Sequence, residues 1–197
     1  MTNIRTALLA ALALTVPQMA LAHTVEGTGN SLYYGFMHPL LGTDHVLAMV
    51  AVGIWGSILG RPLLVALPIA FPLMMVVGAV LGLAGVPFPP VEVGIALSAV
   101  VLGAVIVFLT RPPLWVALTL VGVFGLFHGY AHGAELSPDG NASAFALGFI
   151  AATGMLHGFG ILIGEGVKLL PRTDTLYRAT GAVISAFGLV FLSSALA

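Results

Sequence analysis

Two short stretches of the sequence place side chains that can bind a metal ion inside otherwise apolar segments. The first is HPLLGTDH, residues 38–45, in which His38 and His45 are seven residues apart. Seven residues are two helical turns, so a regular α-helix would present both imidazoles on one face and turn Asp44 away from it. Two interpretations follow. Either Gly42 distorts the helix and lets Asp44 bind a metal, or Asp44 orients an imidazole.

The second stretch is FHGYAHGAE, residues 127–135. His128 and His132 are four residues apart, and Glu135 follows three residues later. These spacings place all three side chains on one face of one helix. Gly129 and Gly133 add little bulk beside them, which leaves room for another helix or for an ion.

Imidazoles with few carboxylates and no thiolates favour a borderline transition metal. The chain has no cysteine, and such ligands suit Ni²⁺, Co²⁺, Zn²⁺, Cu²⁺ or Fe²⁺ better than Ca²⁺ or Mg²⁺. Because they come from two helices, we expect a site at a helix interface. The outer part of an ion path would be lined by four side chains: His38, His128, His132 and Glu135. Asp44 and His45 would lie deeper, with His157 as a further candidate there. Two secondary candidates, each explained as well by a structural or incidental role, are His157 and His23.

The composition indicates which kind of element positions these residues. Of the 197 residues, 59% are hydrophobic and 7% are charged, whereas soluble domains carry about 25% charged residues. Such a chain cannot cover a water-facing surface, so we predict an all-α, polytopic membrane helix bundle. The net charge of −1 and the lack of a basic run give no indication of nucleic-acid binding.

Apolar runs of about 20 residues, the length that crosses a bilayer, recur between glycines, prolines and charges. They predict six transmembrane helices, over residues 33–59, 62–84, 91–110, 113–133, 143–166 and 175–196. Pro68 and Pro72 fall inside the second of these and are expected to bend it or to aid its packing. Trp55 and Trp115 lie near span ends, where interfacial anchors are common.

The first 22 residues have the three parts of a secretory signal peptide. Arg5 supplies the positive charge, ALLAALALTV is the apolar run, and ALA at 20–22 is a cleavage sequence. Cleavage there would leave one transmembrane domain, residues 23–197, that begins with His23; an uncleaved first helix is the alternative. A multi-pass protein of the bacterial inner membrane, with its mature N-terminus in the periplasm, is the simplest consequence.

The distribution of charge agrees with this topology. With the N-terminus outside and six spans, the C-terminus is also periplasmic. Every Lys and Arg after the signal then falls on the cytoplasmic side, as positive residues tend to do: Arg61, Arg111, Lys168, Arg172 and Arg178. The periplasmic side receives no Lys or Arg, and its charged residues are acidic: Glu26, Glu92, Glu135 and Asp139. An odd number of spans would break this segregation.

Both polar stretches resemble the signature motifs of the HupE/UreJ family of nickel permeases. HPLLGTDH lies in the first predicted span after the signal and FHGYAHGAE in the fourth, and the resemblance covers essentially the whole chain. Members of that family are small inner-membrane proteins associated with nickel supply to hydrogenase or urease, and related members are linked to cobalt. The resemblance implies that transport requires six residues: His38, Asp44, His45, His128, His132 and Glu135.

Several other functions compete with uptake of Ni²⁺ or Co²⁺. The chain has no Walker A loop for ATP. A zinc protease would need H-E-x-x-H, but HGYAH has Gly129 in place of that glutamate. A haem protein would use histidine pairs as axial ligands and leave the carboxylates without a role. We predict a permease and not an enzyme, with no permanently bound cofactor; binding of metal or haem without transport is the alternative. The expected partners are a divalent metal ion and the bilayer, and a homo-oligomer is compatible with the sequence.

Overall fold

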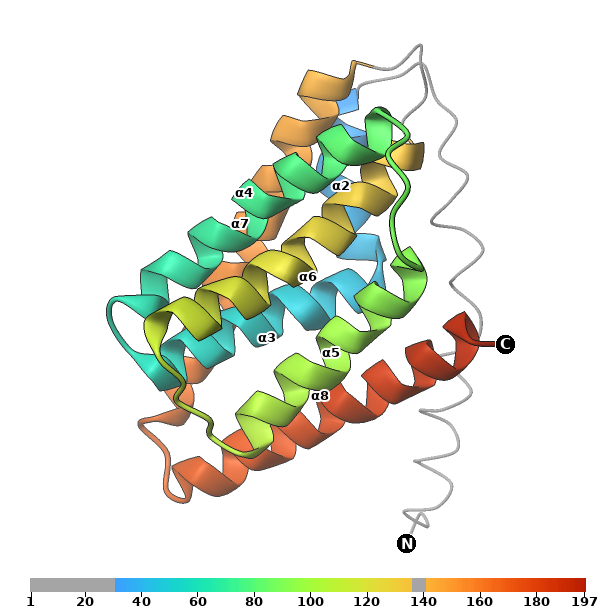
Figure 1. The fold of residues 1–197 in the computed structure, drawn as a ribbon. Coiled ribbons are helices and arrows are strands. Elements are labelled where there is room, and N and C mark those ends of the chain that lie inside the picture. The colour runs from blue at the N-terminus through green and yellow to red at the C-terminus, as the bar shows by residue number, and fades with distance from the viewer. Residues whose placement is uncertain (1–30, 136–140) are drawn as a thin grey trace, which may run out of the picture.

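The computed structural model describes residues 31–135 and 141–197, without the side chain of Glu135. The predicted signal peptide at 1–22 and His23 lie outside the described residues. The described part is all-α, as predicted, and contains seven helices (Figure 1). They are α2 (Ser31–Leu41), α3 (Thr43–Leu59), α4 (Leu63–Leu83), α5 (Val91–Val107), α6 (Leu114–Glu135), α7 (Ala142–Val167) and α8 (Thr173–Ala195).

Four of these helices are long and apolar enough to cross a membrane: α4, α6, α7 and α8. α2 and α3 pass the same test together, although they are bent by 78°. α5 is apolar and has 17 residues, at the short end of the range for spanning helices. The structure therefore supports a multi-pass membrane protein with four to five candidate spans. A full set of six spans stays a prediction.

The span predicted over residues 33–59 consists of two helices, and the distortion that the sequence analysis considered at Gly42 is present. α2 ends at Leu41, α3 begins at Thr43, and Gly42 between them is extended, with φ −80° and ψ 111°. Gly42 donates its N–H to the carbonyl of His38 (3.2 Å), and its own carbonyl accepts the N–H of Val46 (3.0 Å). Because these backbone groups remain paired, the chain can bend sharply without leaving them unsatisfied in an apolar medium.

α3 is the central helix of the bundle, and α2, α4, α5, α7 and α8 all contact it (Figure 1). Eleven of its 17 residues are buried, as expected for a helix that is apolar on all sides. Trp55 is fully buried and donates its Nε1–H to the carbonyl of Thr110 (3.0 Å), so the prediction that it anchors a span at the interface is wrong. Trp115, at the start of α6, is 70% exposed, which suits such an anchor.

Glycines let neighbouring helices approach closely in this bundle. A Cβ atom at Gly129 or Gly133 of α6 would overlap the backbone of α4 at Met75 or Ala79. Small residues spaced by four are a usual means of close packing between membrane helices. The sequence left open whether these glycines admit a helix or an ion, and the structure shows a helix. Gly53 of α3 lies equally close to the backbone of α7.

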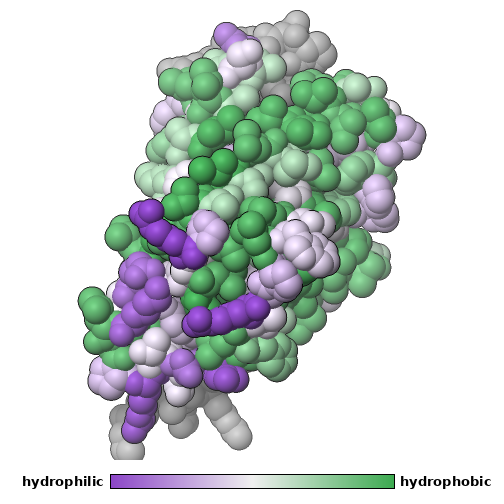
Figure 2. Space-filling view, turned by 60° about the vertical axis from the view of Figure 1, so that its left-hand side comes forward, coloured by the Kyte–Doolittle hydropathy of each residue, from purple (hydrophilic) through white to green (hydrophobic). Residues whose placement is uncertain are grey.

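The two ends of the bundle differ in polarity. The α3–α4, α5–α6 and α7–α8 loops lie at the same end, at the lower left of Figure 1. Figure 2 shows hydrophilic side chains gathered toward that end and a mainly hydrophobic surface above them. The basic residues of these loops are exposed: Arg61, Arg111, Lys168 and Arg172. The bases thus share one end, as the charge pattern predicts, while the side of the membrane that this end faces stays a prediction.

Candidate metal site

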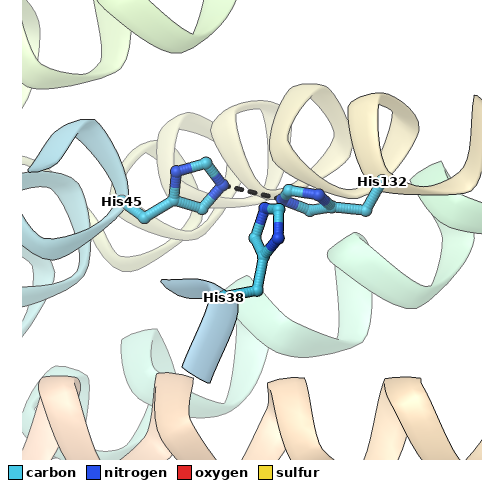
Figure 3. Close-up of side chains that lie close together, drawn as sticks. All are labelled: His38, His45 and His132. Carbon is cyan, nitrogen blue, oxygen red and sulfur yellow. Dashed lines mark hydrogen bonds between the residues drawn. The ribbon is translucent and has the colours of Figure 1, made fainter. Parts of the chain in front are cut away.

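Three histidines from three helices converge toward the end of the bundle opposite the basic loops. His38 belongs to the last turn of α2, His45 to the first turn of α3, and His132 to the last turn of α6. One ring nitrogen of each lies within 4.8 Å of those of the other two, close enough for a single ion to contact all three. Figure 3 shows the rings pointing toward one another, with Nε2 of His45 and Nε2 of His132 2.7 Å apart. We call this group the three-histidine cluster.

The bend at Gly42 brings His38 and His45 together. In a continuous helix, residues seven apart are separated by about 10.5 Å along the axis, at 1.5 Å per residue. The 78° bend reduces the separation of the two ring centroids to 5.8 Å. The spacing in the sequence predicts that these two rings lie together, and they do. The reason is the bend, however, and not a shared face of one regular helix.

Asp44 lies beside the cluster and contacts His45. Its Oδ1 accepts hydrogen bonds from the backbone N–H and from the Nδ1–H of His45, both at 2.9 Å. A neutral imidazole that donates from Nδ1 carries its lone pair on Nε2, the atom that faces His132. The helix is broken at Gly42, and Asp44 contacts Nδ1 of His45 as carboxylates behind metal-bound histidines commonly do; whether Asp44 binds a metal or orients His45 stays a prediction.

His128 lies one turn before His132 on α6 and is fully buried. Its Nδ1–H donates to the carbonyl of Phe124 (2.9 Å), whereas its Nε2 has no hydrogen-bond partner in the described part of the chain. Its ring centroid is 5.1 Å from that of His45. From the sequence, we expected His128 in the outer part of the ion path and Asp44 deeper. The structure shows the opposite burial, because the Asp44 side chain is 31% exposed.

The remaining predicted site residues lie outside the cluster or outside the described residues. Glu135 ends α6, but its side chain, like all of His23, is not among the described parts of the chain. His157 is buried in α7. The structure therefore brings together part of the predicted set. The ring nitrogens of His38, His45 and His132 converge. Asp44 and His128 each contact His45.

Two phenylalanines of α7, which were not predicted from the sequence, form an apolar wall of the cluster. The ring centroid of Phe149 lies 4.5 Å from that of His132 and 5.9 Å from that of His38. Phe145 lies 6.0 Å from His38 by the same measure. Their four-residue spacing was the available signal, because it places both rings on one face of a helix. An apolar wall of this kind limits the access of water to the imidazoles.

Comparisons with known proteins agree with the resemblance of the two motifs. The sequence profile of the family described as HupE / UreJ protein matches residues 10–191. Protein HupE of Rhizobium leguminosarum bv. viciae is 40% identical over 180 residues, which cover 91% of this chain and 93% of that protein. No solved structure matches the chain significantly.

Proposed function

The chain belongs to the HupE/UreJ family of nickel and cobalt permeases, and from that premise we propose that it carries Ni²⁺ across the membrane. The observation that carries the proposal is the convergence of three imidazole nitrogens from three helices inside an apolar bundle. The ion is cargo, and no cofactor is permanently bound. The choice of nickel over cobalt comes from the resemblance of the motifs, because imidazoles alone suit several borderline metals.

The nature of the ligands favours transport over storage. Three neutral imidazoles replace part of the hydration shell of a divalent cation without surrounding it with negative charge. Asp44 is the carboxylate that lies beside them among the described residues. Several carboxylates in a medium of low dielectric constant would hold the ion far more strongly. A permeation site must bind its ion firmly enough to admit it and weakly enough to release it.

The membrane potential supplies the driving force in this proposal. A divalent cation that moves inward gains ~4.6 kcal/mol per 100 mV of inside-negative potential, twice the gain of a single charge. Uptake therefore needs no ATP. We place the chain in the bacterial inner membrane with both mature termini in the periplasm and the basic loops in the cytoplasm. The imported ion would supply the maturation of hydrogenase or urease.

Uptake of radioactive Ni²⁺ by cells that lack other nickel importers tests this proposal. His45→Ala and His132→Ala are expected to abolish uptake, because each removes one of the three converging nitrogens. Tyr130→Phe is the matched control, since its hydroxyl donates to the carbonyl of Val86, away from the cluster. Uptake at the control rate in both histidine variants would contradict the site.

Competition between metals identifies the cargo. We expect unlabelled Ni²⁺ to suppress the uptake of radioactive Ni²⁺ more strongly than equal concentrations of Co²⁺ or Zn²⁺. Stronger suppression by Co²⁺ would instead identify a cobalt permease. If the wild type takes up no metal in cells while the purified protein binds Ni²⁺ tightly, the chain binds metal without transporting it.

A further inference from the structure

Four buried polar side-chain atoms have no hydrogen-bond partner in the described part of the chain. They are Nε2 of His128, Oγ1 of Thr153 and both ring nitrogens of His157. None of these residues is more than 1% exposed. An unpaired buried polar group destabilises a fold, and in native proteins it commonly marks a site for water or an ion. The three residues therefore call for a shared explanation.

These residues lie at neighbouring levels of the bundle. α6 runs toward the end that holds the three-histidine cluster, and α7, the next helix, runs away from it. The rings of His132 and Phe149 are at the same level, since their centroids are 4.5 Å apart. His128 on α6 and Thr153 on α7 come one turn deeper, and His157 lies one further turn along α7.

Phe71 of α4 lies against both histidines of this inner group. Its ring centroid is 5.2 Å from that of His128 and 5.4 Å from that of His157. Phe71 is fully buried, so these contacts are in the interior of the bundle and not on its outer surface.

The prolines of α4 add a backbone oxygen at this level. In a regular helix the carbonyl of Pro68 would accept the N–H of residue 72, but Pro72 has no N–H to donate. Pro68 comes less than one helical turn before Phe71, whose ring contacts that of His157, so this carbonyl is at the level of His157, and neither ring nitrogen of His157 has a hydrogen-bond partner among the described residues. In transporters, backbone carbonyls released from helical pairing recurrently coordinate ions at membrane depth. From the sequence alone, these prolines were expected only to bend the helix or to aid its packing.

The hydrogen bond that His128 makes prepares its other nitrogen for a metal. Because Nδ1–H donates to the carbonyl of Phe124, the lone pair of the neutral ring is on the unpartnered Nε2. Metal-binding histidines usually donate their second ring N–H to a carbonyl or a carboxylate. His45 has the same arrangement toward Asp44.

We propose that His128, Thr153 and His157, with the carbonyl of Pro68, form an inner binding site for a divalent transition-metal ion. The statement that this ion is transported cargo rests on the proposed function. Imidazole nitrogens with neutral oxygen donors select the same borderline metals as the three-histidine cluster. The contact between the rings of His45 and His128, with centroids 5.1 Å apart, joins the two sites. An ion can therefore move inward by exchanging one imidazole at a time.

Equilibrium dialysis of the purified full-length protein against radioactive Ni²⁺ tests the inner site. We expect the wild type at saturation to bind one more Ni²⁺ ion per chain than His157→Ala. The affinity of the three-histidine cluster for Ni²⁺ should stay unchanged in that variant. His157→Cys, which restores a ligand, is expected to recover the ion. Leu156→Ala is the matched control, because it truncates the adjacent buried side chain of α7 without removing a ligand. Equal stoichiometry in the wild type and His157→Ala, or an equal loss in Leu156→Ala, would overturn the proposal.

A second variant keeps the test decisive if His157→Ala does not fold. Thr153→Val preserves the shape of the side chain and removes the hydroxyl, so we expect inner-site affinity to fall about tenfold, a loss typical of a missing polar partner at a metal site. Thr180→Val is its control, since the Thr180 hydroxyl donates to the carbonyl of Leu176 within α8. Unchanged affinity in Thr153→Val would count against the site.

Binding and uptake measured together separate this inference from the proposed function. Dialysis needs no transport, so a wild type that binds the inner ion but takes up no Ni²⁺ contradicts the proposed function and supports the inner site. We expect His157→Ala to lose uptake of Ni²⁺ in cells, while the purified variant still binds Ni²⁺ at the three-histidine cluster. Full uptake by a variant that has lost the inner ion would overturn the role of this site in the path.

Discussion

The chemistry of the three-histidine cluster depends on which nitrogen of each ring carries the proton. Asp44 accepts the Nδ1–H of His45, so Nε2 of that ring is left with a lone pair toward His132. The residue types and their spacing identified these side chains as ligand candidates. They could not identify this contact, because it depends on the backbone conformation at residues 42–45, where Asp44 turns back onto its own neighbour.

Asp44→Asn tests the orienting role of this carboxylate. An amide can donate as well as accept, and it carries no charge, so it no longer holds His45 in one tautomer. We expect affinity for Ni²⁺ to fall by about 10–100-fold, as for other partners behind a metal-bound histidine, with little change in thermal unfolding. Calorimetric titration of the purified variant measures this.

The matched control for that substitution is Asp174→Asn, at the exposed first turn of α8 and far along the chain from the cluster. It is expected to bind Ni²⁺ like the wild type. If Asp44→Asn also binds with wild-type affinity, the carboxylate is not needed to orient His45.

At the scale of the elements, the break between α2 and α3 builds the cluster. Two short helices that meet at 78° bring His38 and His45 to the same point, where a straight helix would keep them two turns apart. α6 then adds His132, and α7 adds the wall of Phe145 and Phe149. The close approach of α6 to α4 depends on glycines, because a larger side chain would meet the backbone of the neighbouring helix.

Gly42→Ala tests the fit at this break. The backbone angles of Gly42 are open to any L-residue, so strain in φ and ψ is not the reason to expect an effect. An added Cβ would lie 2.9 Å from Nδ1 of His45 and 3.0 Å from Oδ1 of Asp44, and would crowd the pair that orients the cluster. We expect lower affinity for Ni²⁺ and slower uptake, with unchanged helical content by circular dichroism.

Gly154→Ala controls for the loss of a helical glycine, since its Cβ would meet no atom within 4 Å. That variant is expected to bind and transport like the wild type. Wild-type affinity in Gly42→Ala as well would show that the close fit around Gly42 is not required.

At the scale of the whole molecule, the bundle has a basic end, an apolar outer surface and a mainly apolar interior that holds a few buried polar side chains. Large hydrophobic side chains are exposed along its helices, as a lipid-facing surface requires, and α4 alone exposes Val65, Ile69, Leu73, Val76, Val77, Val80 and Leu83. The polar atoms that lack partners lie inside, between helices. This arrangement suits a protein whose cargo crosses through the bundle and not along its surface.

The cysteine-free chain allows a direct test of its orientation. Ala84→Cys and Leu169→Cys place single thiols at exposed positions at opposite ends of the bundle. If the basic loops are cytoplasmic, a membrane-impermeant thiol reagent will label Ala84→Cys in intact cells and Leu169→Cys only after lysis. The unsubstituted protein is the control, because it has no thiol to label. The reverse pattern would contradict the proposed orientation and place the three-histidine cluster at the cytoplasmic end of the bundle.

The sequence by itself determined the helical membrane class, the polarity of the two ends and most of the ligand candidates. These properties follow from the composition and from the spacing of residues along the chain. They do not depend on how the helices pack against one another. Composition and spacing along the chain also limit what the sequence can predict. Gly42 could be named from the sequence as a possible distortion, but the angle of the bend could not, and the apolar setting of Trp55 does not distinguish an interface from a core.

Only the tertiary structure decided which histidines meet and what surrounds them. His38, His45 and His132 come from three helices, and whether their nitrogens converge depends on the angle at Gly42 and on glycine-mediated packing elsewhere. The proposed inner site of His128, Thr153 and His157 likewise depends on how α6 and α7 pack against Phe71 of α4. Periodicity describes one helix at a time, and contacts between helices are determined by how their surfaces fit together.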